Sequence, residues 1–502
     1  MQFKYINLLN LYSNLMILKR AVNNLVKKIP PIKKLIIEKN TLIEEKNNLI
    51  EEKNNLIEEK NNLIEEKNNL IEEKNNLNNI NIKLIEEKET LKHELFELNQ
   101  IRYQIVIQKL QKKIKQKQKI NVIFIVIHSS VWQYDDLYKK YSNDKKYNPI
   151  IIVAPYILCK KDEMIEEMNK SYSYFKNKNY SVLKTYNKTN LFSDIKTELQ
   201  PDIIFFTNPH KITNDKYYIN NFYKDTLTCY VPYGIMSANI EKNQYNQEFH
   251  NLTWKNFYET EIHKKIAEKY ADNKGVNVLV TGYPKCDIFL NRKYKAKNVW
   301  KKTDKNLKKI IWAPHHTIEN NEKELGYSNF LEYHQIMLDI AKKYQNKIQI
   351  AFKPHPILLT KLKTHPDWGE RKIHDYCEKW KNEKNTQLEL DEYTDLFLSS
   401  DGMILDSVSF IAEYMFINKP ALFMIKDNTI NNKFNIFGSI AYNLLYKSQN
   451  KNDLINFIET VILKEKDERK EQREKFLNQY LIPPNNHNAT DNIYSFINNY
   501  LK

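Results

Sequence analysis

A seven-residue repeat near the N-terminus restricts the fold of this chain more than any other feature. Ile-Glu-Glu-Lys-Asn-Asn-Leu occurs five times without change between Ile43 and Leu77. Leucines keep the same seven-residue register from Leu35 to Leu98. A period this close to the helical repeat indicates a long helix, and we predict a helical stalk over residues 36–117. If fully helical, it would reach on the order of 120 Å at a rise of about 1.5 Å per residue.

The repeat is typical of a spacer or an oligomerisation device rather than of a catalytic site. Ordinary coiled coils alternate apolar spacings of three and four residues, whereas here the two apolar residues of each repeat are neighbours and give one ridge. Two asparagines per repeat also lower the helix propensity. Regular spacing begins only after Leu84, with Leu91, Leu95, Leu98 and Ile105. We expect a long-helix or coiled-coil extension that is able to self-associate as a homo-oligomer.

The first residues, 1–35, form a basic amphipathic segment. Leucines and valines recur at helical spacing over residues 3–28, with lysines and an arginine among and after them. Pro30-Pro31 ends the segment, because proline blocks helix continuation. A helix of this kind either lies in a membrane interface or docks on its own protein. Since no apolar run of about 18 residues and no small-residue cleavage site occurs, we expect neither a transmembrane helix nor a secretory signal.

Composition further limits the classes of protein to which this chain can belong. The 502 residues, 41% of them hydrophobic, suffice for two folded domains plus an extension. The net charge of +16 indicates an anionic partner, which is nucleic acid, the inner face of a membrane or a phosphate-rich polymer. The four cysteines form no CxxC pair, which fits a reducing cytosol. Without a GxGxxG or P-loop motif, a dinucleotide or P-loop ATPase site is disfavoured.

Beyond about Lys119, short apolar runs alternate with helical patterns, which indicates parallel βαβ units. A first α/β domain, 118–295, has predicted strands at 120–127, 150–154, 202–207, 226–231 and 276–281. A lysine-rich linker at 291–308 leads into a second α/β domain, 296–502, with predicted strands at 310–313, 348–352, 395–398, 402–405 and 421–425. Helices are predicted at 133–142, 328–344, 408–417 and 451–480. Two such domains in tandem, with a cleft between them, are the geometry of GT-B glycosyltransferases.

Three polar loops of the second domain each follow a predicted strand. They are Pro314-His315-His316-Thr317, Lys353-Pro354-His355-Pro356 and Asp406-Ser407-Val408-Ser409, with Glu413 one helical turn further on. Ligands bind where parallel strands end and loops lead into helices. We therefore expect the three loops to converge on one phosphate-bearing ligand, a nucleotide-diphosphate donor.

The side chains of each loop can bind a phosphate, although some of them also have an ordinary structural explanation. His315, His316 and Thr317 can bind a phosphate, and a histidine can act as a base near neutral pH. The alternative is that these histidines simply lie on the surface. Two adjacent histidines are weak evidence for a metal site. Lys353 supplies charge, while the prolines hold His355 in one pose. The hydroxyls and N–H groups of residues 406–409 form an anion site or an ordinary N-cap. Glu413 could reach ribose hydroxyls.

The motifs of the second domain together resemble those of the CDP-glycerol glycerophosphotransferases of teichoic-acid and capsule synthesis. These motifs are Trp-Ala-Pro, Lys-Pro-His-Pro, Leu-Asp-Ser-x-Ser-Phe-x-x-Glu-Tyr and a following Lys-Pro. The resemblance covers roughly residues 119–450. It implies a GT-B fold of tandem Rossmann-type domains, CDP-glycerol as donor, no metal or other cofactor, and transfer of glycerol phosphate to a lipid-linked acceptor. It also implies that His355 lies near the donor phosphates and that Asp406 and Ser409 end a phosphate-binding element, in which Val408 replaces the family's first serine.

The first domain departs from that family at one position. Val-Pro-Tyr-Gly (231–234) stands where the polymerases carry a His-Gly pair thought to supply the base for the acceptor hydroxyl. A tyrosine with an ordinary pKa near 10 is a poor base at pH 7. Tyr233 and Gly234 thus mark the acceptor side, and either His250 or His316 is the base, or the acceptor differs. Residues 282–287 resemble another family segment, as a site or as a structural turn.

We therefore predict a cytoplasmic transferase, peripheral on the inner face of the cell membrane, that acts on a lipid-linked surface glycan. One alternative is a GT-B glycosyltransferase that uses a nucleotide sugar. The other is a non-catalytic coiled-coil scaffold whose α/β part only binds. Nucleic acid is not expected as a partner, because no basic-aromatic module of the RNP type is visible.

Overall fold

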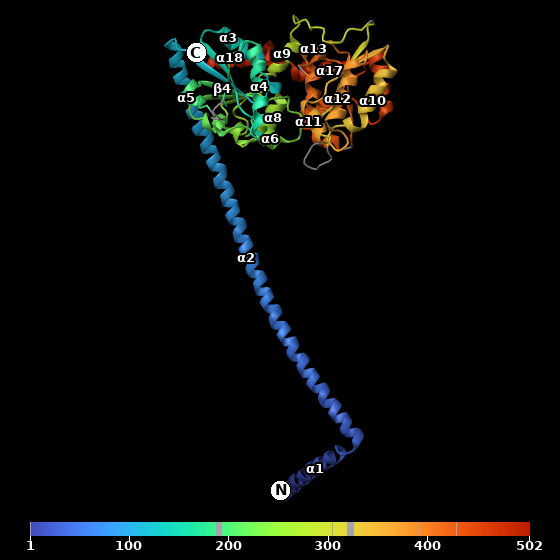
Figure 1. Ribbon diagram of the computed structural model, residues 1–502. Helices are drawn as coiled ribbons and strands as arrows, with labels where there is room; N and C mark the ends of the chain where they lie inside the picture. Colours follow the sequence, from blue (N-terminus) through green and yellow to red (C-terminus); the bar gives the residue numbers. More distant parts are fainter. Residues whose placement is uncertain (1, 187–192, 304, 319–325, 391, 428) are drawn as a thin grey trace. The chain divides into compact units, whose positions relative to one another are not determined.

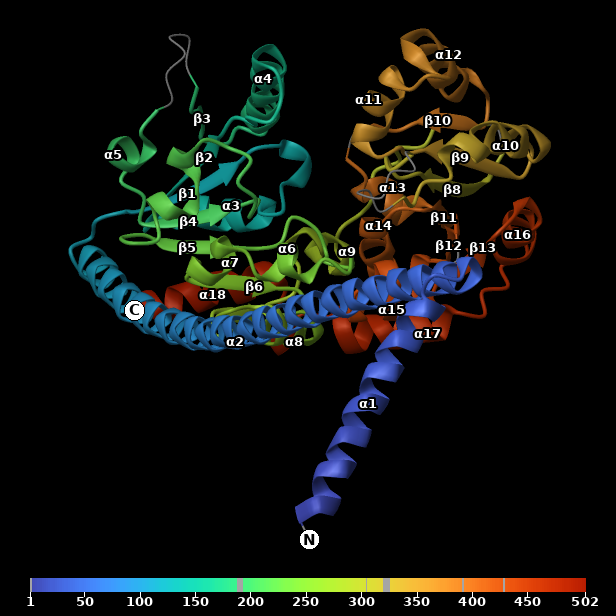
Figure 2. The same cartoon turned by 90° about the horizontal axis from the view of Figure 1, so that it is seen from below.

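The computed structural model describes residues 2–186, 193–303, 305–318, 326–390, 392–427 and 429–502, with only the backbone of residues 2–9, Ser409 and Asn431. It divides into two compact units, Met1–Leu91 and Lys92–Lys502. Figures 1 and 2 show the chain in two views.

Two helices open the chain, α1 (Gln2–Val26) and α2 (Pro30–Lys115). Pro30 stands at the start of α2, where a missing N–H costs no hydrogen bond, so the proline pair begins the second helix as well as following the first. Figure 1 draws α2 as one long helix. Near its end, Tyr103, Val106 and Leu110 are buried in the main hydrophobic core. None of the described helices is both long and apolar enough to cross a membrane.

The first sheet has seven parallel strands in the order β3-β2-β1-β4-β5-β6-β7. Its strands are β1 (Ile120–Val126), β2 (Tyr147–Val153), β3 (Val182–Lys184), β4 (Ile203–Phe206), β5 (Leu227–Tyr230), β6 (Lys255–Tyr258) and β7 (Val278–Val280). The helices in this part are α3 (Asp135–Asn143), α4 (Lys161–Asn177), α5 (Ile195–Leu199), α6 (Glu241–Tyr245), α7 (Glu248–Leu252), α8 (Glu261–Tyr270) and α9 (Asp287–Leu290). The predicted parallel βαβ pattern is confirmed here, although the short strands β3 and β6 were not predicted.

The second sheet has six parallel strands in the order β10-β9-β8-β11-β12-β13. Its strands are β8 (Lys308–Ala313), β9 (Ile348–Phe352), β10 (Thr386–Leu388), β11 (Gly402–Leu405), β12 (Ala421–Met424) and β13 (Tyr446–Ser448). The helices are α10 (Phe330–Lys343), α11 (Pro356–Thr364), α12 (Gly369–Asn382), α13 (Thr394–Ser399), α14 (Val408–Glu413), α15 (Ile436–Asn443), α16 (Lys451–Asn456), α17 (Lys470–Phe476) and α18 (Ala489–Leu501). Figure 2 shows both sheets, with all their strands except β7 labelled.

Two predictions in the second domain are wrong. Asp395–Leu398 forms part of helix α13 rather than a strand, because so short an apolar run fits a buried helix equally well. The half-buried Lys419 donates from Nζ to the carbonyl of Leu398 at 2.6 Å and so satisfies the end of this helix. The single helix expected over 451–480 is interrupted after Leu463, where Glu465 adopts a positive φ of 57°.

The last helix, α18, returns to the first sheet. Both oxygens of Asp287 accept backbone N–H groups at its start, from Ala489 at 2.8 Å and Thr490 at 2.9 Å. Asp287 thus ties the family-like segment 282–287 to the chain end, which is a structural function.

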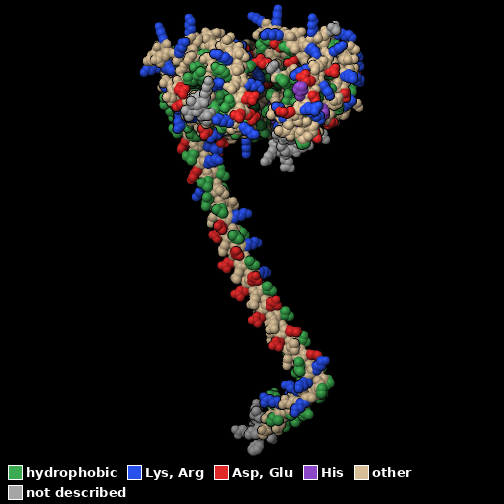
Figure 3. All heavy atoms as spheres, viewed as in Figure 1, with side chains coloured by type: hydrophobic (Ala, Val, Ile, Leu, Met, Phe, Trp, Pro, Cys, Tyr) green, Lys and Arg blue, Asp and Glu red, His purple; other side chains and the backbone are tan. Residues whose placement is uncertain are grey.

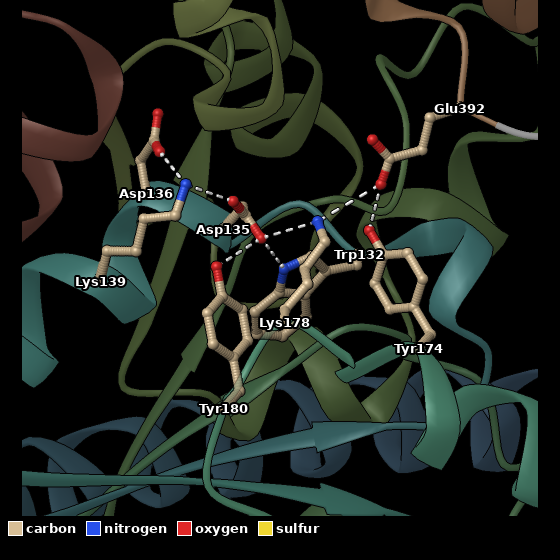
Figure 4. A network of polar contacts seen from close by, with 8 residues as sticks. All are labelled: Trp132, Asp135, Asp136, Lys139, Tyr174, Lys178, Tyr180 and Glu392. Carbon is tan, nitrogen blue, oxygen red and sulfur yellow. Dashed lines mark hydrogen bonds and ion pairs between the residues drawn. The ribbon is translucent and has the colours of Figure 1, made fainter. Parts of the chain in front are cut away.

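The two α/β halves also meet through polar contacts (Figure 4). Lys178 donates to Asp135 at 3.2 Å and to Glu392, from the second half, at 3.3 Å, and Tyr174 donates to the same carboxylate. Elsewhere Gly438 lies so close to the Ser237 carbonyl that a Cβ would stand 2.1 Å from that oxygen. The halves therefore pack through defined contacts at separate places.

Candidate active site

The three predicted loops lie at the carboxyl ends of β8, β9 and β11, which are neighbours in the second sheet. Asp406 joins two of them. One of its oxygens accepts the backbone N–H of His315 at 2.5 Å, and the other accepts that of Asn329 at 2.6 Å. Burial raises the pKa of Asp406 to about 7, although these two hydrogen bonds oppose the rise. Asp406 therefore holds the loops together, and its oxygens are already engaged.

Three histidines come together from the first two loops. Their ring centroids are 4.2 Å apart for His315 and His316, 4.4 Å for His316 and His355, and 5.1 Å for His315 and His355. Ring nitrogens of all three lie within 4.8 Å of one another. By spacing alone, the cluster is able to hold either a metal ion or an anion.

The hydrogen bond at His355 favours the anion. Its Nδ1 accepts the backbone N–H of Ile357 at 3.2 Å, so the proton of the neutral ring is on Nε2. A histidine that binds a metal through one nitrogen normally donates an N–H from the other, which is the opposite arrangement. His355 therefore presents an N–H donor, the group that a phosphate oxygen accepts.

The charge state of these rings follows from their surroundings. Burial, together with the nearby His316, Lys353 and Lys361, lowers the pKa of His355 to about 3. Burial also holds the pKa of His315 well below its usual value, with further lowering by His316 and His355. Both rings are neutral at pH 7, so lysines must supply the positive charge for a diphosphate.

Lysines are present at this edge of the sheet. Lys353 is 6% exposed, and its backbone N–H donates to the Trp312 carbonyl at 2.8 Å, which fixes the loop. Lys361 of α11 lowers the pKa of His315 and His355, so it is close to both rings. Lys426, just beyond β12, lowers the pKa of Asp406. Sequence reasoning missed Lys361 and Lys426, although Lys426 follows a strand end just as the predicted loops do.

The other residues predicted to bind the donor have different surroundings in the structure. Thr317 Oγ1 accepts the N–H of Tyr327 at 2.8 Å and lies 3.0 Å from His315 Nδ1, so it supports the histidine loop. Ser407 is the buried N-cap of α14, and the side chain of Ser409 lies outside the described residues. Glu413 is 3% exposed and accepts a hydrogen bond from Tyr393. Its carboxylate is thus turned into the core, where a ribose would not reach it.

The two residues predicted for the acceptor side, Tyr233 and Gly234, follow β5 in the first sheet. Burial raises the pKa of Tyr233 above its usual value, which makes the phenol a still poorer base. A Cβ on Gly234 would meet no atom within 4 Å, so the backbone borders open space. His210, which sequence reasoning missed, follows β4, and its ring centroid is 5.9 Å from that of Tyr233.

The proton of His210 is also fixed by its partner. Gln247 Nε2 donates to the Asn243 carbonyl at 2.6 Å and lies 2.7 Å from His210 Nδ1. Because a carbonyl only accepts, this Gln247 atom is the nitrogen, and His210 carries its proton on Nε2. A small pocket lies beside the ring, lined by His210 together with Thr207, Asn208, Thr213 and apolar residues of β1 and β4.

His250, one of the two predicted bases, lies in the core. It is 1% exposed, and its Nδ1 accepts the backbone N–H of Gln247 at 3.2 Å. Burial lowers its pKa to about 3. The ring caps the start of α7, and an acceptor hydroxyl would not reach it.

The structure also places a buried carboxyl group at the end of β6. Burial raises the pKa of Glu259 to about 8. One of its oxygens accepts the backbone N–H of Met236 at 3.4 Å, and the other is 3.7 Å from His263 Nδ1. Sequence reasoning missed this residue, which supports the loop that follows Tyr233 and Gly234.

Comparison with known proteins gives one family. The family model described as CDP-Glycerol:Poly(glycerophosphate) glycerophosphotransferase matches residues 231–499. No curated protein sequence matches the chain.

Several solved structures are similar. The S. aureus MnaA–UDP structure is 15% identical and covers 76% of this chain and 97% of its own, with a TM-score of 0.51. The Neisseria meningitidis UDP-GlcNAc 2-epimerase bound to UDP-GlcNAc is 15% identical over 76% and 100% of the two chains, with a TM-score of 0.48. The wall teichoic acid polymerase TagF is 13% identical over 82% and 98%, also with a TM-score of 0.48. At such identities the likeness to MnaA shows the fold alone, and it agrees with the GT-B-like pair of Rossmann-type domains.

Proposed function

This chain belongs to the CDP-glycerol:poly(glycerophosphate) glycerophosphotransferase family, and from that premise we propose that it transfers glycerol phosphate from CDP-glycerol to a lipid-linked surface glycan. The matched residues include the loop at 231–234 and the donor-side loops of the second sheet. The observation that carries the proposal is His355, whose Nε2–H is fixed beside two further imidazoles and within the electrostatic reach of Lys353 and Lys361.

The reaction is an in-line displacement at the β-phosphorus of the donor. An acceptor hydroxyl oxygen forms a new bond to that phosphorus, and the bond from phosphorus to the bridging oxygen breaks, so that CMP leaves. Negative charge grows on the phosphoryl oxygens and on the leaving phosphate. Lys353, Lys361 and the Nε2–H of His355 stabilise it, and preorganised donors of this kind supply much of the catalysis in phosphoryl transfer.

The hydroxyl proton passes to a histidine. Of the two residues expected as base, His250 is buried and engaged with the backbone of Gln247. His316 is only partly buried, unlike His250, and stands in the three-histidine cluster, so we assign the base to it. His355 is unsuited to the role, because Nδ1 already accepts an N–H and Nε2 already carries a proton.

Transfer proceeds without a metal ion in this proposal. Mg²⁺ in phosphoryl-transfer sites is held by carboxylates. Among the described residues at this edge of the sheet, the carboxylate of Asp406 is engaged with two backbone N–H groups, and that of Glu413 accepts from Tyr393. Lysine charge takes the place of the metal.

The N-terminal helix holds the enzyme at the cytoplasmic face of the membrane, where a lipid-linked acceptor is available. Apolar side chains of α1, among them Leu11, Leu15 and Leu18, are exposed, and Lys19 and Arg20 lie beside them. Exposed apolar residues next to basic ones suit an anionic membrane interface. Binding to anionic vesicles, compared with a chain that lacks residues 1–28, tests this assignment.

A donor assay tests the proposed chemistry. Purified full-length chain is incubated with lipid-linked acceptor and either CDP-glycerol or one of a panel of nucleotide sugars, and nucleotide release is measured. We expect CMP release from CDP-glycerol alone. Turnover of a nucleotide sugar with inert CDP-glycerol would instead support the glycosyltransferase alternative. Full activity of a normally folded His355→Ala variant in the cell would support the scaffold alternative.

A further inference from the structure

The charges of the repeat in α2 have no partners on their own helix. On a helix surface, side chains three and four positions apart are neighbours. In each repeat the lysine follows the two glutamates directly and precedes the next two by five and six positions. Lys46, for example, has only Leu42, Ile43, Leu49 and Ile50 at helical-neighbour spacing. The ion pairs that stabilise an isolated polar helix are therefore impossible within the repeat.

The apolar side chains of the repeat are uncovered as well. Leu49 is 64% exposed and Ile50 is 46% exposed, and the other repeats give similar values. Figure 3 shows hydrophobic, acidic and basic side chains recurring along α2 on the face in view. A long helix rich in asparagine, with neither ion pairs nor a covered apolar face, is not stable by itself in water. The exposed isoleucines and the unpaired charges therefore favour another molecule along this helix.

The five-residue spacing between charges identifies that molecule. In a parallel coiled coil, a residue at position g faces the residue five positions later, at e′ of the partner helix. With Lys46 at g, the frame places Asn47 at a, Ile50 at d and Glu51 at e. In this frame five lysines, Lys39, Lys46, Lys53, Lys60 and Lys67, face Glu44, Glu51, Glu58, Glu65 and Glu72 of an identical helix.

Other arrangements leave the charges unpaired. With Leu49 at d, Lys46 occupies the core position a and Ile50 occupies e, so that no acidic residue faces a lysine. In an antiparallel pair, g faces g′, which opposes lysine to lysine. Charge complementarity thus selects both the frame and the parallel direction.

We propose that residues 36–85 of α2 bind a second copy of this chain as a parallel, in-register coiled coil, with asparagine at a and isoleucine at d. This inference is independent of the transfer reaction. Identical repeats alone would tolerate a shift of seven residues. The end of the segment prevents it, because Asn78 takes a d position and Ile82 takes an a position, the reverse of the repeat. A shifted pair would bury Asn78 against isoleucine.

Charge reversal on the full-length chain tests the pairing. Lys46, Lys53, Lys60 and Lys67 are changed together to glutamate, which makes four of the five lysine–glutamate contacts on each side of the pair repulsive and leaves only Lys39 facing Glu44. We expect a wild-type mass that is a multiple of 60.3 kDa and at least about a hundredfold weaker association in the variant, because four contacts on each side of the pair change from attraction to repulsion. The matched control changes Glu52, Glu59, Glu66 and Glu73, at the outward f position, to lysine and should associate like the wild type.

Two results would overturn the proposal. One is a monomeric wild-type chain at micromolar concentration. The other is a failure of the lysine-to-glutamate variant to associate with a complementary chain in which Glu51, Glu58, Glu65 and Glu72 are changed to lysine, because that mixture restores every e–g pair.

Disulfide trapping tests direction and register while leaving the charges intact. In a Cys159→Ser background, Asn47→Cys places a thiol at a, and Asn48→Cys places one at the outer b position. A parallel, in-register pair forms the Asn47→Cys disulfide at least about tenfold faster, since its Cβ atoms alone are at bonding distance. Equal rates, or a faster reaction of Asn48→Cys, would contradict the assignment.

Discussion

The carboxyl edges of the two sheets differ in charge, although both carry loops that follow parallel strands. The edge of the second sheet combines three imidazoles with Lys353, Lys361 and Lys426. The edge of the first sheet presents His210, Tyr233 and the open backbone at Gly234. The second edge therefore offers more positive charge to an anion than these groups of the first edge do, and the proposed placing of donor and acceptor follows that difference.

Buried carboxyl groups also differ between the two edges. Asp406 accepts short backbone hydrogen bonds from two loops, at 2.5 and 2.6 Å, whereas the backbone N–H of Met236 donates to Glu259 over a longer distance, 3.4 Å. Burial raises the pKa of each group, to about 7 for Asp406 and about 8 for Glu259. The same chemical group therefore fastens two loops at one edge and is only weakly engaged at the other.

Removing the fixed donor of the second edge should have the largest effect. We expect His355→Ala to lower kcat by about 10²–10³-fold, because one preorganised donor to the developing negative charge is lost. His374→Ala, on the exposed face of α12, is the matched control. His210→Ala should instead raise the KM for the acceptor and leave the donor KM unchanged. Steady-state kinetics with both substrates varied measures these parameters. If both variants changed the same one, kcat or the acceptor KM, the two sheet edges would not have the different roles assigned to them.

The carboxyl that fastens the loops should matter for stability. Asp406→Asn sets an amide N–H against the backbone N–H of His315 or Asn329, so we expect a loss of about 2–3 kcal/mol in the free energy of unfolding. Denaturant unfolding followed by circular dichroism measures it. An unchanged midpoint would show that the loops hold together without Asp406.

Charge at the donor edge should affect substrate affinity more modestly. Lys361→Ala should raise the KM for CDP-glycerol by about tenfold, equivalent to about 1.4 kcal/mol for one partly screened charge near a diphosphate. Lys363→Ala, two residues along on the exposed side of α11, serves as control. The difference should shrink at high salt. Equal KM values for the two variants would remove Lys361 from the donor site.

The smallest effect concerns Glu259 and has a defined sign. Because the folded-state pKa of about 8 lies above the unfolded value, the folded chain binds the proton more tightly, and stability falls as pH rises from about 4.5 to about 8. Glu259→Gln stays uncharged, so it should gain at least about 1 kcal/mol relative to the wild type between about pH 5 and about pH 8.5. Exposed Glu261→Gln should show no such gain in thermal unfolding across this range.

Much of the fold was predictable because it depends on local patterns. Continuous apolar runs such as Ile120–Val126 and Ile348–Phe352 are strands in the structure, in parallel sheets, as expected. Strands such as Thr386–Leu388 and Tyr446–Ser448 are short and partly polar, and no periodicity distinguishes them from loops. Asp395–Leu398 was misassigned because its helical state depends on packing and on the remote Lys419.

In the candidate site, too, some positions followed from local sequence patterns and others did not. The positions of His315, His355 and Asp406 followed from strand ends, since those are set by the chain order. The choice between His250 and His316 as base did not, because neither burial nor hydrogen bonding can be read from the local sequence. Only folding buries His250 at the start of α7, places His316 beside His355, and brings the overlooked His210 next to Tyr233.

By itself, the sequence determined the long repeat helix, the succession of parallel strands and the polar loops that follow them. These depend on the period of apolar residues and on neighbours a few positions apart. Tertiary structure decided which nitrogen of His355 carries a proton, which carboxyl groups are engaged, and which lysines stand near the histidines. Burial and hydrogen bonding decide such properties, and both depend on side chains that lie far away along the chain and meet only once it has folded.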